Sequence, residues 1–294
     1  GGYVGDNTTI SRSSPVQIGA LTTWDKLVTA VSFSFAIKTD NTLWAWGSNT
    51  DGKMGAGTTI NYSSPIQVGA LANWAQVNGG NNFATAITTS GELYAWGENS
   101  NGQLGINTAV DTNSPIQVGA LTTWLQVSAA GYHWHAIKTD GTLWANGNNG
   151  FGRLGTTNLI NTSSPVQVGA LTNWAQVSSG ASGGVAVKTD GTIWAWGYNA
   201  QGVLGQNNTI TQSSPVQIGS LTNWSVASNV NYQIVAIKTD GTLWSWGNNN
   251  AGQLGQGDVI ILSSPVQIGS GTKWTKISEA TNGVDMFWAI QETE

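Results

Sequence analysis

Short apolar stretches alternate with turn-forming residues along the whole chain. In one part of the sequence they read WAQVSSG, VAVKTDG and GTIWAWG, beginning at Trp174, Val185 and Gly191. Stretches of this length that are rich in Val, Ile or Trp are typical of β-strands. No segment keeps the helical spacing of apolar residues over ten positions. The pattern therefore predicts an all-β protein built from many short strands.

The stretches recur with a period of 50 residues, which the prolines mark. Every proline falls in the segment SSPVQIG or a close copy of it, and a tryptophan follows nine residues later. Proline lacks an amide hydrogen, so in a sheet it belongs at an edge or at the start of a strand. We predict that PVQIG begins the outermost strand of each unit, where proline protects an exposed edge. The prolines are Pro15, Pro65, Pro115, Pro165, Pro215 and Pro265.

Three stretches and this edge strand make a four-stranded antiparallel unit. The Asp-Gly pairs at Asp140, Asp190 and Asp240 accept the positive φ that a tight hairpin turn needs. Six units of this kind predict a single domain, a six-bladed β-propeller. We expect the blades at residues 24–70, 74–120, 124–170, 174–220 and 224–270, with a closing blade from 274–294 and 1–20.

The closing blade is expected to be assembled from both ends of the chain. The C-terminal residues would supply its two inner strands, and the segment at Pro15 would supply the outermost strand. The equivalent of residues 242–250, which form the third strand of a unit, is present at neither end. Three alternatives remain for this missing third strand. A neighbouring chain could supply it by strand addition, the native polypeptide could extend beyond these residues, or the blade could close with three strands.

Composition argues against several classes of partner. Charged residues make up 9% of the chain, against roughly 25% in typical soluble domains. Ten Lys and Arg against fifteen Asp and Glu leave no basic stripe for nucleic acid. The chain has no cysteine for a disulfide or a thiolate metal site. We expect no membrane span, because no apolar run approaches ~20 residues, and GGYVGDNTTI does not have the pattern of a signal peptide.

A glycine-rich motif of the form W-G-x-N-x-x-G-x-L-G follows the third stretch. Examples are WGENSNGQLGIN from Trp96, WGYNAQGVLGQN from Trp196 and WGNNNAGQLGQG from Trp246. On this motif the sequence resembles the regulator-of-chromosome-condensation repeat family over its whole length. The resemblance implies a β-propeller, commonly of seven blades, whereas six units are counted here. It implies function less directly, because members of one fold family do unrelated things.

Three roles known in that family can be compared with this sequence. The founding members are exchange factors for the small GTPase Ran and use an inserted wedge and basic contacts, but the unbroken spacing here leaves no wedge. A plant ultraviolet-B photoreceptor relies on many arginines, whereas this chain has only Arg12 and Arg153. A secreted bacterial member that inhibits β-lactamase by protein contact alone fits the composition best. The sequence is therefore closest in character to bacterial secreted or phage-type members.

Candidate catalytic groups are few. His133 and His135 lie two residues apart in one predicted strand, a spacing that could hold a metal ion. The only carboxylate nearby is Asp140, which the hairpin turn uses, so we interpret both histidines as structural or surface residues. The serines of SSP recur in every unit, and no nucleophile is paired with a base. We therefore expect no enzyme activity, no metal and no cofactor.

Tryptophan pairs such as Trp194 and Trp196 repeat at the same phase in several units. Their i, i+2 spacing places both rings on one face of the sheet. Residues that repeat in this way usually build the interface between neighbouring units. A platform for stacking glycans or bases is the alternative.

The connections that vary from unit to unit are the predicted binding surface. They join the first strand to the second and the third to the fourth, and should emerge on one face of the propeller. The unit at 124–165 departs most, because Asn146 replaces the second tryptophan of the pair. The alternative explanation for the variable loops is sequence drift where nothing constrains them. The alternative explanation for the aromatic residues of this unit is that Trp134 or Phe151 fills a gap left by Asn146. Aromatic residues and arginine dominate interface hot spots, so the candidate partner-binding residues are Tyr132, His133, Trp134, Phe151, Arg153, Tyr198 and Tyr232.

These observations predict a non-enzymatic, extracellular or surface-displayed propeller that binds a protein or a glycan through its variable loops. The alternative is a structural component of a virion or cell-surface assembly, which would self-associate through a repeated face or through the incomplete closing blade. An exchange factor of the founding type is a third hypothesis, which the missing wedge and the acidic charge disfavour.

Overall fold

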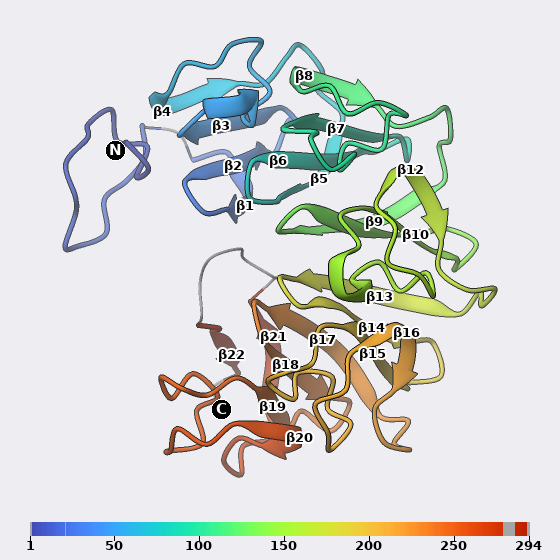
Figure 1. The fold of residues 1–294 in the computed structure, drawn as a ribbon. Coiled ribbons are helices and arrows are strands. Elements are labelled where there is room, and N and C mark those ends of the chain that lie inside the picture. Colours follow the sequence, from blue (N-terminus) through green and yellow to red (C-terminus); the bar gives the residue numbers. More distant parts are fainter. Residues whose placement is uncertain (1, 21, 279–285, 293–294) are drawn as a thin grey trace.

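The computed structural model describes residues 2–20, 22–278 and 286–292. It contains five four-stranded antiparallel sheets and one two-stranded sheet, which follow one another in chain order (Figure 1). The first sheet contains β1 (Trp24–Thr29), β2 (Phe33–Lys38), β3 (Leu43–Gly47) and β4 (Tyr62–Gln67). The second contains β5 (Trp74–Gly79), β6 (Phe83–Thr88), β7 (Leu93–Gly97) and β8 (Thr112–Gln117).

The later sheets repeat this order. The third contains β9 (Trp124–Ala130), β10 (His133–Lys138), β11 (Leu143–Gly147) and β12 (Thr162–Gln167). The fourth contains β13 (Trp174–Gly180), β14 (Gly183–Lys188), β15 (Ile193–Gly197) and β16 (Gln212–Gln217). The fifth contains β17 (Trp224–Val230), β18 (Gln233–Lys238), β19 (Leu243–Gly247) and β20 (Leu262–Gln267). The two-stranded sheet contains β21 (Trp274–Ile277) and β22 (Ala289–Gln291), and the short 3₁₀ turns are η1 (Thr50–Gly52) and η2 (Gly150–Gly152).

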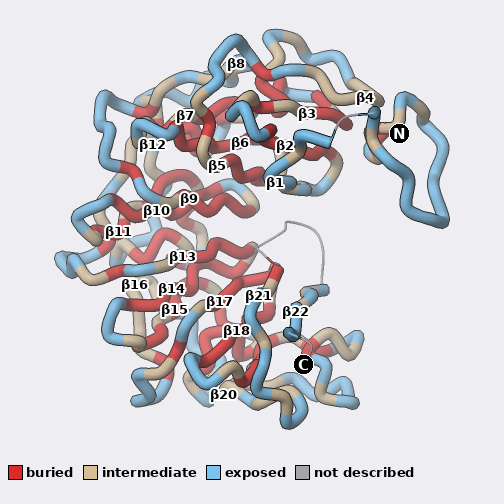
Figure 2. Tube along the Cα trace, turned by 180° about the vertical axis from the view of Figure 1, so that it is seen from behind, coloured by how far each residue is buried: buried red, intermediate tan, exposed pale blue. Residues whose placement is uncertain are grey.

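The sheets are the blades of a β-propeller. The first strand of each blade lies innermost. These innermost strands contact one another in the order β1, β5, β9, β13 and β17. The second strands lie between neighbouring sheets, so β10 contacts β13 and β14 contacts β17. The buried residues therefore follow the middle of the five complete blades, while the outer strands and many residues of the links are less buried (Figure 2). The strands β21 and β22 have no buried residue. An all-β propeller is confirmed, with five complete blades and one partial blade.

The proline-containing segments form the outermost strands of all five complete blades. The order β12-β11-β10-β9 is an example, with Pro165 inside β12. The sequence suggested that each proline begins its strand. In the structure β12 starts at Thr162, so Pro165 lies inside the strand. An edge strand bonds on one side only, so a residue without an amide hydrogen is tolerated inside it.

The closing blade differs from the prediction. In the part of the chain that the structure describes, the last sheet contains only β21 and β22, and residues 11–20 form no strand. The N-terminal segment instead packs on the first blade, where Asn7 N donates to Ser63 O at 2.8 Å, and the two termini lie on different blades (Figure 1). In complete blades the fourth strand pairs with the third. The segment at Pro15 has no such third strand to pair with among the described residues.

Candidate functional site

A tryptophan bond joins each complete blade to the link before it. In four blades the tryptophan that directly precedes the last glycine of the third strand donates its Nε1 hydrogen to a carbonyl 43 residues earlier. Trp96, for example, bonds to Lys53 O at 3.0 Å, and Trp246 bonds to Val203 O at 2.9 Å. The sequence predicted that the repeated tryptophans build the interfaces between blades. This is confirmed for the four tryptophans that make these bonds, because their rings are buried.

The third blade makes the same connection with different residues. Trp134, from β10, donates its Nε1 hydrogen to Gln103 O at 2.8 Å, and its side chain is 0% exposed. Asn146 occupies the usual tryptophan position and donates to Gly102 O at 2.8 Å. The assignment of Trp134 to the binding surface is therefore wrong. The alternative that Trp134 fills the gap left at Asn146 is confirmed.

The two histidines are also buried, so the assignment of His133 to the binding surface is wrong. His135 Nδ1 lies 2.8 Å from Ser179 Oγ, and its Nε2 lies 3.1 Å from Arg153 O. Burial lowers the pKa of His135 to about 3 and that of His133 well below its usual value. Both rings are therefore neutral at pH 7, and within the described residues no cluster of three possible metal ligands includes them.

Four of the candidate residues meet on the surface of the third to fifth blades. The ring of Phe151 lies 5.1 Å from that of Tyr198, and the ring of Tyr198 lies 6.1 Å from that of Tyr232, centroid to centroid. The Arg153 guanidinium lies 5.2 Å from the centre of the Phe151 ring. We call Phe151, Arg153, Tyr198 and Tyr232 the aromatic patch. They come from three different blades, so the fold brings them together.

The backbone at Phe151 projects its ring outward. Phe151 lies in η2 with φ 63° and ψ 20°, a left-handed conformation that bulky residues rarely adopt, and its side chain is 52% exposed. Asp51 takes the same conformation in the first blade, with φ 65°. Such strain costs on the order of 1–3 kcal/mol and is typical of functional positions.

Arg153 is held by two neutral oxygens. Its Nε donates to Ala181 O at 2.8 Å, and its Nη1 donates to Asn148 Oδ1 at 3.1 Å. Burial lowers the pKa of Arg153, and the facing Tyr232 opposes that shift only in part. The guanidinium is therefore partly desolvated without a carboxylate partner among the described residues.

Tyr132 lies at the border of the aromatic patch. It forms part of the turn between β9 and β10, its side chain is 37% exposed, and its carbonyl accepts a hydrogen bond from Asn148 N at 2.9 Å. Asn148 is the residue that holds the Arg153 guanidinium. Tyr132 therefore sits at the same end of the molecule as the long links, as the sequence suggested.

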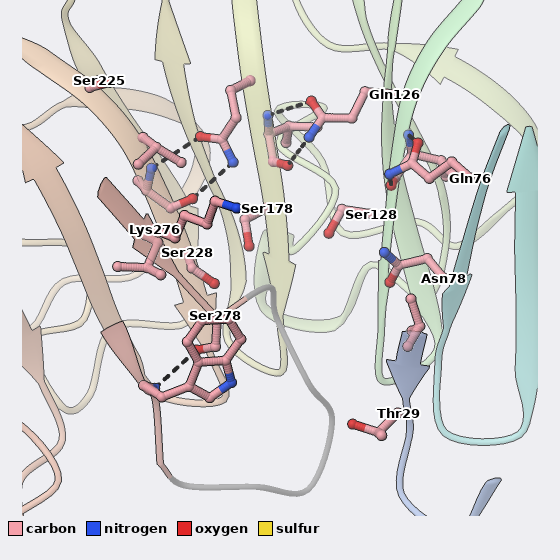
Figure 3. A pocket seen from close by; sticks show the side chains of 18 of the residues that line it. Thr29, Gln76, Asn78, Gln126, Ser128, Ser178, Ser225, Ser228, Lys276 and Ser278 are labelled. Carbon is pink, nitrogen blue, oxygen red and sulfur yellow. Dashed lines mark hydrogen bonds between the residues drawn. The ribbon is translucent and has the colours of Figure 1, made fainter. Parts of the chain in front are cut away.

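A concave site, the central channel, was not predicted from the sequence. The innermost strands enclose a cavity of about 720 Å³ (Figure 3). Around it, glutamine side chains bond to the backbone of the next blade: Gln126 Nε2 donates to Val177 O at 3.2 Å, and Val177 N donates to Gln126 Oε1 at 3.0 Å. Gln76 bonds in the same way to Val127, and Gln176 to Ala227. The equal spacing of these glutamines in the sequence is the signal that could have revealed the channel.

The profile of the RCC1-like domain matches residues 2–288. The chain belongs to the RCC1-like domain family. Solved structures share the fold of this RCC1-like propeller. The human protein WBSCR16 is 20% identical, with a TM-score of 0.82, and the match covers 92% of this chain and 72% of that one. A comparison with curated protein sequences gives no significant match.

Yeast relatives are similar in fold as well. Prp20p from Saccharomyces cerevisiae, known for its binding to Gsp1p and histones, is 17% identical with a TM-score of 0.76, over 90% of this chain and 68% of that one. Yeast RCC1 (Prp20) bound to Kap60 is 14% identical with a TM-score of 0.71, over 92% of this chain and 81% of that one. Identities this low support the shared fold and no shared partner. In the described part of this RCC1-like propeller, no helix has the length and apolar character needed to cross a membrane.

Proposed function

We propose that this RCC1-like propeller is a non-enzymatic binding protein that contacts its partner through the aromatic patch and the neighbouring Tyr132. The main support for this proposal is that the ring of Tyr198 contacts those of Phe151 and Tyr232, and that the partly buried Arg153 lies against Phe151. Exposed aromatics and arginine on a rigid frame are the residues that dominate interface energetics. The remainder of the chain serves as a single propeller domain of six units, which holds these loops in place.

A protein partner is favoured over a glycan. Planes of neighbouring rings in the aromatic patch are inclined by 64° and 70°, so the rings do not form one flat platform for a sugar. Arg153 adds a guanidinium whose planar donors suit a carboxylate or a backbone carbonyl. We place this contact outside the cell or on a cell or virion surface, because the chain is poor in charge and its polar residues are mainly hydroxyls and amides.

A role as a structural component of an assembly is the second candidate. One β-branched apolar residue per unit is exposed at the same phase of the long link. Because an exposed apolar side chain recurs in each unit around the ring, each unit offers an equivalent contact to another copy of the chain. These residues are Ile10, Ile60, Val110, Ile160, Ile210 and Ile260.

The comparison of two double variants separates the two candidates. Phe151→Ala with Tyr198→Ala should abolish retention of the native-source partner in affinity capture. The melting temperature should change little, because the Phe151 side chain is 52% exposed and that of Tyr198 is partly exposed. Leu121→Ala, which removes an exposed apolar side chain elsewhere, should retain it. Loss of self-association in Ile160→Ala with Ile210→Ala, measured by light scattering, would instead support the assembly role. Retention of every captured protein by the first variant would contradict the contact proposal.

An exchange-factor role has less support. Gsp1p binding belongs to Prp20p, and the 50-residue spacing from Pro15 to Pro265 leaves no inserted wedge in this chain. A direct nucleotide-release assay with a small GTPase should therefore show no acceleration.

A further inference from the structure

Each link that leads from a third strand to a fourth carries a glycine at one phase of the repeat. In five links this glycine is buried against an indole ring of the next blade. A Cβ at Gly205 would lie 2.9 Å from Trp246 Nε1, and a Cβ at Gly155 would lie 2.9 Å from Trp196 Cδ1. Only glycine fits there, because a side chain would occupy the place of the ring. The five glycines are Gly5, Gly55, Gly105, Gly155 and Gly205.

The sixth glycine of this kind, Gly255, is exposed. A Cβ there would meet only Ile268 of its own blade among the described residues, at 3.7 Å and 3.9 Å. Gln253 O stands at the phase of Lys53 O and Val203 O, which accept indole hydrogens. In the part of the chain that the structure describes, which includes every tryptophan, no group donates to Gln253 O. We call Gln253 and Gly255 the indole socket of the last link (residues 248–261).

The last link already has the conformation of the other links. Asn249 Oδ1 accepts a hydrogen bond from Leu254 N at 2.9 Å, as Asn199 Oδ1 does from Leu204 N at 2.8 Å. The φ angle of Gly255 is 68°, and that of Gly205 is 67°. The indole socket therefore keeps its shape without a ring on it, and such a preformed site loses little freedom on binding.

The open edge of β22 would direct a strand onto this socket. In the fifth blade β19 pairs with β18, where Trp246 lies opposite Ile234 and packs on the preceding link. β22 takes the place of β18 in the last sheet, because it pairs with the first strand β21, and no described strand pairs with its other edge (Figure 1). A strand added there in the register of β19 would place its tryptophan opposite Phe287 and against Gly255.

We propose that the edge of β22 and the indole socket bind an extended segment of another protein that carries a tryptophan. The segment adds as a strand to β22, while its indole packs on Gly255 and donates its Nε1 hydrogen to Gln253 O. The five filled sites of this kind within the chain define the occupant, because each of them holds an indole. An open edge alone accepts many strands, whereas the indole contact selects the sequence of the partner. The indole socket shares no residue with the aromatic patch, so either proposal can fail alone.

The test is the binding of a third-strand peptide to the whole chain. The probe acetyl-GTLWSWGNNN-amide has the sequence of residues 241–250, and calorimetric titration should show one saturable site. The same peptide with Trp246→Ala should bind at least about tenfold more weakly, because it lacks the ring and its hydrogen bond. The peptide with Ser245→Ala is the matched control, since four other units have alanine at this phase, and its affinity should be unchanged. Hydrogen exchange should show added protection of the β22 amides.

Two variants of the chain locate the binding. Gly255→Asn places a side chain where the indole packs, and asparagine tolerates a positive φ, so the chain should fold and bind the peptide at least about tenfold more weakly. Gly257→Asn is the control, because Asn107 and Asn207 occupy this phase with positive φ and a Cβ at Gly257 would meet no described atom within 4 Å. It should leave the affinity unchanged.

Three results would overturn the proposal directly. They are no binding of the peptide, equal binding of the peptide with Trp246→Ala, and an unchanged affinity in Gly255→Asn. A chain that is dimeric in light scattering and that the peptide converts to monomers would also overturn it, because the site would then belong to a second copy.

Discussion

Trp134 donates its indole hydrogen to the carbonyl of Gln103 at 2.8 Å, and so makes from the second strand the contact that other blades make from the third. In the second blade, Trp96 bonds to Lys53 O, which is the residue at the Gln103 phase. The position of the indole is therefore kept although the strand that supplies it changes.

Removal of this indole should destabilise the protein. Trp134→Ala leaves a cavity and an unpaired carbonyl at Gln103, and should lower the free energy of unfolding by about 3–5 kcal/mol. Adding Asn146→Trp to that variant restores a ring at the usual position and should recover part of the loss. Urea unfolding measures both. A loss no larger than that of the exposed Leu121→Ala would contradict the structural role.

The channel glutamines should contribute to stability by joining blades. Gln126→Ala leaves the Val177 N–H and carbonyl without their side-chain partner, and should cost about 1–3 kcal/mol. The fifth unit has Val226 at this phase. Val226→Gln should therefore gain about 0.5–1.5 kcal/mol by reaching the backbone at Ile277. Thermal unfolding of the two variants should move in opposite directions, and a shift of both in one direction would refute the assignment.

The buried histidines should make the protein sensitive to acid. Burial holds the pKa of His135 at about 3, while an unfolded histidine titrates near 6.5. The unfolded state therefore binds more protons below pH 6.5, so this contribution is complete above that pH and is lost as the pH falls toward 3.

The loss from His135 should reach about 1.4 kcal/mol per pH unit within that window. Burial also lowers the pKa of His133, so its contribution has the same sign. His133→Phe with His135→Val introduces residues that other blades have at these phases, Phe83 and Val185. Chemical unfolding between pH 7 and pH 4 should show a shallower dependence for this variant. An unchanged slope would assign the acid sensitivity to other groups.

A lysine between two tryptophans should couple energetically to them. Lys138 Nζ lies 3.5 Å from the centre of the Trp144 ring and 4.8 Å from that of Trp124. In the second blade, where Thr88 replaces the lysine, Tyr94 replaces the tryptophan. A double-mutant cycle with Lys138→Thr and Trp144→Tyr should give a coupling energy of about 0.5–2 kcal/mol. Additive effects would show that the contact is incidental.

The propeller could be predicted from the sequence because each strand occurs many times with the same edge and turn residues. Which side chains of the third blade are buried could not be predicted from the sequence. β10 is covered on both sides by neighbouring sheets, so all its residues from His133 to Lys138 are buried, and alternation does not separate an outer face. Phe151, Tyr198 and Tyr232 were identified because they interrupt the repeat in loops. Their ring contacts follow only from the curvature of the ring.

The N-terminal segment has a consequence for how such rings change in size. Tyr3 O accepts the Trp46 indole hydrogen, as Lys53 O does for Trp96, so residues 2–7 act as a link placed ahead of the first blade. Gly55 permits this approach, because a Cβ there would lie 2.6 Å from Trp96 Nε1. The unit that can be duplicated or deleted therefore runs from one glycine link to the next, across a blade boundary. A gene that gains one copy of this unit extends the ring without creating an interface of a new kind.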